Sequence, residues 1–140
     1  QRLVELELSA EIASEAPAVR DDWPSDIRFT INGVPLGVWT SPGDYGERRR
    51  GRQTPEWWRD FWNQYGLWKT LRVTRNGTYM DNERLSDATV RDLPPDEKFW
   101  TIRFAVDESR GRAGGLTLFG AGFGDFDADI VIRMHYEEEA

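Results

Sequence analysis

The chain has 140 residues and no cysteine, which excludes disulfide bonds, thiolate metal sites and thiol catalysis. Its 25 Asp and Glu residues outnumber 18 Lys and Arg residues, and a net charge of −7 disfavours a domain that binds nucleic acid on its own. No apolar run approaches the roughly 18 residues of a transmembrane helix. We therefore expect a single cytoplasmic domain over residues 1–140, without a membrane partner.

The first half of the chain carries strand signals. Polar and apolar residues alternate over residues 4–8 and again over residues 27–31. Asn32-Gly33 is a strong hairpin signal, and residues 34–38 predict the return strand. Pro35 cannot donate a hydrogen bond to a sheet, so it predicts an edge strand or a bulge there.

A long loop and one helix are expected next. Residues 41–54 are rich in Gly, Pro and charge and predict a loop. Thr54-Pro55 is typical of a helix start, so we expect a short helix over residues 55–65. Trp58, Phe61, Trp62 and Tyr65 would share one face of this helix, a spacing that favours packing onto a sheet over a ligand site or a dimer contact.

The second half returns to strands. Residues 67–74, 99–106, 116–119 and 130–136 predict strands, with hairpin turns at Asn76-Gly77 and Asp81-Asn82. Ile130, Ile132, Met134 and Tyr136 are expected to form the inward face of the last strand. Roughly eight short strands predict a mainly β fold, a two-sheet, jelly-roll-like β-sandwich similar to galactose-binding domains.

Several segments together resemble one family. They are residues 11–17 (EIASEAP), 23–27 (WPSDI), 31–33 (ING), 37–46 (GVWTSPGDYG), 54–58 (TPEWW), 64–67 (QYGL) and 114–120 (GGLTLFG). With these segments the chain resembles the C-terminal domain of bacterial ArsR-type winged-helix transcriptional regulators. The resemblance implies an effector-binding half of a longer regulator, whose DNA-binding half is absent from these residues. We therefore assign no residue of this chain to DNA contact or to metal sensing.

The loop at residues 39–46 is the first candidate ligand site. Trp39 could stack on a ligand, while Asp44 and Tyr45 offer polar groups at a loop tip. Gly43 and Gly46 permit a close approach of the backbone. The alternative is a turn cluster that caps the sandwich, in which Asp44 bonds to backbone groups. The sequence leaves both interpretations open.

The polar faces of the predicted strands are the second candidate. Trp68, Arg72, Arg103, Arg133 and His135 all fall on faces opposite the apolar sets. If these strands share a sheet, its outer face would present Trp and Arg together, a combination that suits a sugar-like or anionic small molecule. The alternative is an ordinary solvated face.

No motif for catalysis or a cofactor is present. His135 is the only histidine, which disfavours a transition-metal site or a His-based triad. Asp125, Asp127 and Asp129 alternate as in a calcium loop, yet the remaining EF-hand positions do not match, and Ca²⁺ binding stays open. The sequence thus predicts a non-catalytic ligand-sensing or dimerisation domain of a transcriptional regulator, able to form a homodimer. The alternative is a carbohydrate-binding module whose Trp side chains stack on a glycan.

Overall fold

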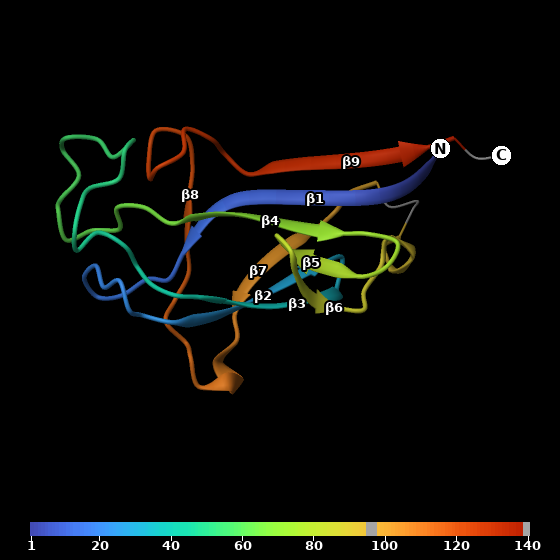
Figure 1. Cartoon of the computed structure of the whole chain (residues 1–140), viewed down its shortest axis with the longest axis horizontal. Helices are drawn as coiled ribbons and strands as arrows, with labels where there is room; N and C mark the ends of the chain where they lie inside the picture. Colours follow the sequence, from blue (N-terminus) through green and yellow to red (C-terminus); the bar gives the residue numbers. More distant parts are fainter. Residues whose placement is uncertain (95–97, 139–140) are drawn as a thin grey trace.

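Two antiparallel sheets build the domain. A computed structural model describes residues 1–94 and 98–138, and within them six strands form one sheet and three strands the other. The larger sheet runs β6 (Glu83–Ser86), β5 (Thr78–Met80), β4 (Leu67–Val73), β1 (Arg2–Ala13), with both β8 (Thr117–Phe119) and β9 (Val131–Glu137) beyond β1. The smaller sheet runs β3 (Val34–Ser41), β2 (Ser25–Ile31), β7 (Ile102–Val106). The predicted mainly β, two-sheet sandwich is confirmed (Figure 1).

Strand β1 is the centre of the larger sheet. It pairs with β4 on one side, and on the other side with β9 along its first part and with β8 at its end. Its even-numbered residues from Leu6 to Ile12 are buried, as the period of two in a strand requires. They pack against the inward residues of β2, β3 and β4; the core comprises Leu6, Leu8, Ala10, Ile12, Ile27, Phe29, Ile31, Leu36, Trp39, Leu71, Val73, Met80, Val90 and Leu93.

The predicted β2–β3 hairpin forms at the Asn-Gly pair. Asn32 and Gly33 have φ of 49° and 79°, the left-handed conformations that a tight hairpin turn needs. β3 is an edge strand of the smaller sheet, and the register slips opposite Pro35. Both features follow from the missing N–H of proline.

The helix expected over residues 55–65 does not form. Its place is taken by two turns, in which the N–H of Trp58 donates to Pro55 O and that of Trp62 to Arg59 O. In a helix, Arg59 O would accept from the N–H four residues later, whereas here it accepts from the N–H three residues later and from the Gln64 side chain. Across the described residues the only helices are the short 3₁₀ turns η1 (Val90–Asp92) and η2 (Glu108–Arg110), and none is long and apolar enough to cross a membrane.

The last strand lies at the sheet edge with its apolar face open. Met134 pairs with Leu6 and Ile132 with Leu8, so these side chains face inward as predicted. Their predicted burial is wrong, because Ile130, Ile132, Met134 and Tyr136 are all exposed. The smaller sheet has three strands, against six in the larger sheet, and leaves this edge uncovered.

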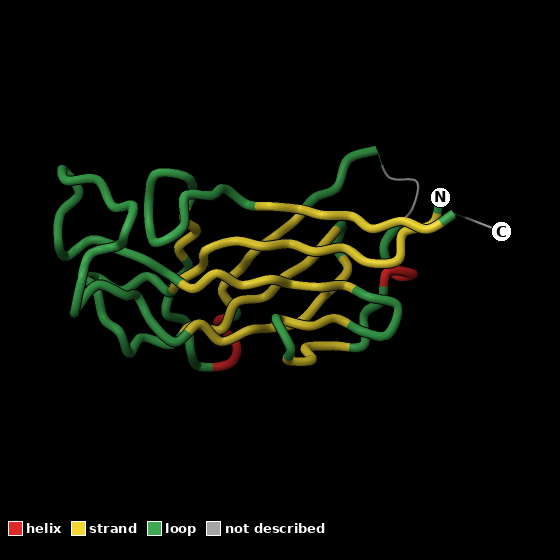
Figure 2. The backbone as a smooth tube through the Cα atoms, turned by 45° about the horizontal axis from the view of Figure 1, so that its top comes forward, coloured by secondary structure: helices red, strands yellow, loops and turns green. Residues whose placement is uncertain are grey.

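The long loops and the chain ends lie at opposite ends of the sandwich. Figures 1 and 2 show residues 42–66 and 120–130 as loops at one end, while the first residues of β1 and the last of β9 lie at the other. β1 connects the two ends, and the nine residue-to-residue steps from Arg2 to Glu11 span about 30 Å at the usual rise of a strand. We call the first region the loop end.

Candidate functional site

The predicted ligand loop, residues 39–46, is a buried support rather than an exposed tip. Trp39 is 7% exposed and belongs to the core, and Asp44 is 1% exposed. Tyr45 is half-buried. The expectation that this loop presents Trp39 and Asp44 to a ligand is therefore wrong, and the alternative of a turn cluster that caps the sandwich describes the loop better.

Asp44 ties three segments together at the loop end. Its Oδ2 accepts the N–H of Ala16 at 2.9 Å and its Oδ1 the side-chain amide of Asn63 at 3.0 Å, while its backbone exchanges two hydrogen bonds with Arg20. Burial raises the pKa of Asp44 above its ordinary value, although the bonds from Ala16 and Asn63 oppose the shift. A carboxyl so enclosed serves the fold and does not reach a ligand.

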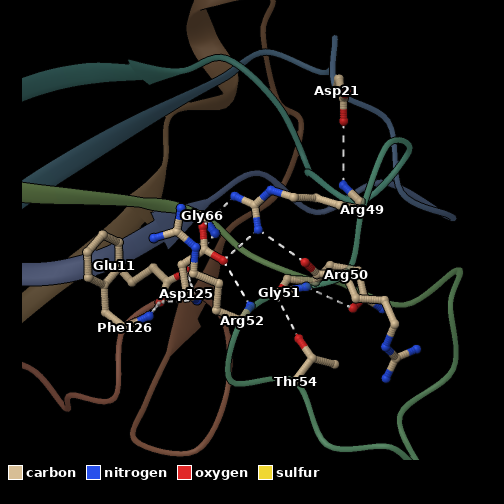
Figure 3. A network of polar contacts seen from close by, with 12 residues as sticks. Glu11, Asp21, Arg49, Arg50, Gly51, Arg52, Thr54, Gly66, Asp125 and Phe126 are labelled. Carbon is tan, nitrogen blue, oxygen red and sulfur yellow. Dashed lines mark hydrogen bonds and ion pairs between the residues drawn. The ribbon is translucent and has the colours of Figure 1, made fainter.

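The stacked rings of Tyr45 and Tyr65 lie beside an ion pair that joins the two long loops, Arg49 with Asp125. The two rings stack with centroids 5.3 Å apart, and the Arg49 guanidinium lies 3.8 Å from the centroid of the Tyr65 ring. Arg49 then forms a bidentate pair with Asp125 at 2.9 and 2.7 Å (Figure 3). Burial alone would raise the pKa of Asp125, but the Arg49 hydrogen bonds hold it below its usual value.

Glu11 is the innermost member of this network. Its side chain is fully buried, and its carboxylate accepts backbone N–H groups from Gly66 at 2.8 Å, Asp125 at 2.9 Å and Phe126 at 3.1 Å. Figure 3 shows these bonds joining β1 to both long loops. A buried charge needs such partners, because an unpaired carboxylate in the interior is costly. Glu11 thus fixes the position of both loops relative to the sheet.

Gln64 shapes the loop that carries the aromatic residues. Its side chain is fully buried; Nε2 donates to the carbonyls of Arg59 and Trp62, each at 2.9 Å, and Oε1 accepts the Gly51 N–H at 3.3 Å. One side chain therefore satisfies backbone groups that a helix would otherwise pair. The buried Gln64 amide therefore fixes the conformation of the turns at residues 55–62.

These turns present a cluster of aromatic rings to the surface. Trp58 is the half-buried centre: its indole N–H donates to Asn63 O, and its ring packs edge-on against Trp57, Trp62 and Phe123, with centroids 4.9 to 5.6 Å away. Around it, Trp57 is 69%, Phe61 52% and Trp62 39% exposed. We call Trp57, Phe61 and Trp62 the aromatic platform. A cluster of large exposed aromatic side chains on a fixed backbone is typical of a binding surface.

Four of the remaining candidates share the outer face of the larger sheet. The register places Trp68 and Arg72 of β4 and Arg133 and His135 of β9 on that face. Arg72 and His135 line a polar hollow of about 520 Å³, in which Arg72 also meets Glu5 at 3.4 Å. Trp68 lies apart from the hollow, with its ring 5.4 Å from that of Phe126 at the loop end.

Arg103 does not join them. It lies on β7 of the smaller sheet, so the single platform of Trp and Arg that the sequence predicted does not form. Arg133 is exposed on the edge strand β9 and does not line the hollow. The eight predicted residues are thus divided among the loop end, the outer face of the larger sheet and the smaller sheet.

Metal ligation has little support from geometry. Among the described residues one group of potential ligands comes together, Glu5, Glu7 and His135, whose ligand atoms lie within 4.8 Å of one another. The Arg72 guanidinium that contacts Glu5 would compete with a cation there. The aspartates of residues 125–129 do not converge: Asp125 pairs with Arg49, Asp127 accepts the Gly122 N–H, and Asp129 the Ala121 N–H.

Sequence reasoning missed the aromatic platform as a surface, although it named Phe61 and Trp62. The spacing of Trp58, Phe61 and Trp62 fitted a helix, and only the buried Gln64 amide reveals why these residues form turns. No protein-family model, no curated protein and no solved structure matches this chain, so relatives supply no function.

Proposed function

We propose that this domain is a non-catalytic recognition module, the effector-binding half of a transcriptional regulator, and that it binds its ligand on the aromatic platform. The observation that carries the proposal is the exposure of Trp57, Phe61 and Trp62 on turns that buried polar groups hold in place. The family resemblance of residues 37–46 and 54–58 supports the regulatory role. A jelly-roll topology, a cytoplasmic location and contact with DNA through a separate domain belong to the same proposal.

The chemistry of the platform favours a sugar-like ligand. Tryptophan rings stack on the C–H faces of sugars, and polar groups at the border of the rings can bond to hydroxyls. One such group is at hand in Arg59, whose guanidinium lies 5.7 Å from the Trp62 ring, and the exposed Glu56 precedes Trp57 in the chain. A fixed platform also loses little conformational entropy on binding.

A free-standing carbohydrate-binding module is the second candidate for the same surface. The exposure of Trp57 and Trp62 favours it, since a glycan needs accessible indoles. The two functions differ in the response of DNA binding. A regulator that contains this domain would change its operator affinity when the ligand is added, whereas a carbohydrate-binding module would have no operator at all.

A thermal-shift screen tests the binding surface. A ligand that binds only the folded state raises the melting temperature, so sugars and sugar phosphates can be screened against the chain. We expect a hit to shift the native protein and the control variant Phe99→Ala, which removes another exposed aromatic, but not the variant Trp57→Ala/Trp62→Ala. A hit that shifts the double variant equally, or a screen without any hit, would contradict the proposal.

Self-association through β9 is a candidate for the predicted homodimer. This edge strand has its outer backbone edge unpaired within the described residues, and Ile132, Met134 and Tyr136 are exposed on one face. Apolar edge strands readily pair with another chain. Light scattering should then report a dimer for the native chain and a monomer for Met134→Lys; a monomeric native chain at high concentration would exclude this candidate.

A further inference from the structure

A second pocket lies at the end of the sandwich opposite the loop end. It encloses about 360 Å³ between the start of β1, the β4–β5 turn, the η1 segment, the residue that leads into β7, and β9. The described lining residues are Gln1, Arg2, Leu3, Arg75, Val90, Arg91, Leu93, Pro94, Trp100 and Tyr136. We call this hollow the end pocket. It contains none of the residues of the aromatic platform.

Apolar and polar surface contribute about equally to the wall. Leu3 and Tyr136 come from the inner face of the larger sheet, at the edge that the smaller sheet does not cover. Val90, Leu93 and Trp100 close the pocket from the side of the smaller sheet, and Val90 and Leu93 are themselves buried. The uneven number of strands in the two sheets thus leaves a hollow with an aromatic residue on either side.

Three arginines lie in the described wall of the pocket although the chain as a whole is acidic. Arg2, Arg75 and Arg91 line it, and Glu137 is the carboxylate that pairs with Arg2 and, at 3.5 Å, with Arg75. The hydrogen bond from Arg2 holds the pKa of Glu137 below its usual value, so Glu137 stays charged at neutral pH. Among the described residues the pocket wall thus carries three guanidinium groups, in a chain whose net charge is −7.

We propose that the end pocket binds a small amphipathic organic anion, with its apolar body against Trp100 and Tyr136 and its carboxylate or phosphate on Arg75 and Arg91. An apolar cavity of about 150 Å³ holds one benzene ring, so the end pocket has room for an aromatic ring and its charged group. Guanidinium groups bind carboxylates and phosphates with paired hydrogen bonds, and the aromatic walls exclude water from the apolar body.

Phenyl phosphate is a suitable probe, with inorganic phosphate and phenol as its two halves. In isothermal titration calorimetry we expect phenyl phosphate to bind the native chain at least tenfold more tightly than either half. Arg91→Gln should weaken phenyl phosphate at least tenfold. Trp100→Leu should weaken phenyl phosphate while leaving inorganic phosphate unchanged. Raising the salt concentration should also weaken binding, because the charges lie near the surface.

The controls separate this site from the aromatic platform. Arg48→Gln removes a guanidinium whose side chain is 90% exposed at the loop end, and it should bind phenyl phosphate like the native chain. Trp57→Ala/Trp62→Ala should also bind it normally, whatever the outcome of the sugar screen. Equal affinity of Arg91→Gln and the native chain, equal affinity for phenyl phosphate and inorganic phosphate, or loss of binding in the platform variant alone would each overturn the inference.

Discussion

Replacing Glu11 by Gln tests whether the buried carboxylate holds the loop end together. The carboxylate accepts three backbone N–H groups, from Gly66, Asp125 and Phe126, across its two oxygens. Gln keeps one oxygen and turns an NH₂ group toward the remaining donors, so at least one buried N–H loses its acceptor. An unsatisfied buried donor costs about 1–3 kcal/mol, and replacing charge-assisted bonds by neutral ones adds about 1 kcal/mol. We therefore expect Glu11→Gln to lower the free energy of unfolding by about 2–4 kcal/mol.

Urea unfolding followed by tryptophan fluorescence measures this loss. With m of about 2 kcal/mol per M, the midpoint should fall by about 1–2 M, while m itself stays constant if the folded state is retained. Glu7→Gln is the matched control, since Glu7 lies on the same strand, is only half-buried and has His135 at 3.6 Å as its partner. It should change stability by no more than about 0.5 kcal/mol. Equal effects of the two substitutions would refute the role of Glu11 in holding the loop end together.

Three further predictions follow from the same geometry. Gly124→Ala should destabilise the fold by more than Gly122→Ala in urea unfolding: both residues have positive φ, but a Cβ at Gly124 would lie 2.4 Å from Glu11 Oε1, whereas Gly122 has open space around it. The Ser109 hydroxyl and the Arg28 guanidinium hold the pKa of Asp107 at about 2, below its ordinary 3.8. Asp107 therefore stabilises the fold above pH 4, and this contribution is lost as pH falls through 2. The difference in unfolding midpoint between the native chain and Asp107→Asn should shrink over that range, and a constant difference would contradict the prediction. Trp39→Ala should cost about 3–5 kcal/mol as a core truncation and Trp57→Ala less than about 0.5 kcal/mol, and the reverse order in thermal unfolding would mean that the platform packs rather than binds.

The sheets could be predicted because their signals are local. Alternation in β1, β2 and β9 and the Asn32-Gly33 turn depend on residues close in sequence, and each agrees with the structure. The absence of a helix at residues 55–65 could not be predicted from residues close in sequence. Its absence depends on Gln64 bonding back to carbonyls and on the Gly66 N–H bonding to Glu11, which is 55 residues away in the sequence. Long-range partners override local helix preference.

The candidate site was harder to predict because exposure depends on the tertiary fold. Trp39 and Trp57 both lie next to Gly- or Pro-rich segments, and nothing in their neighbours tells a core indole from a surface indole. β3 turns Trp39 toward β2 and the core, whereas the turns of residues 55–62 carry Trp57 outward. Strand polarity did place Arg72 and His135 on one face, because the period of two is also local.

The position of β1 has a kinetic consequence. This strand precedes all its partners along the chain, the first of which, β4, begins at Leu67 and another, β9, at Val131, so its apolar residues have no sheet to join until β4 has been synthesised. Closing such distant pairings is slow, and sandwiches dominated by them fold in milliseconds to seconds. During synthesis the segment from Leu6 to Ile12 is a natural substrate for a chaperone, and swapping of this strand between nascent chains is the misfolding route that the topology leaves open.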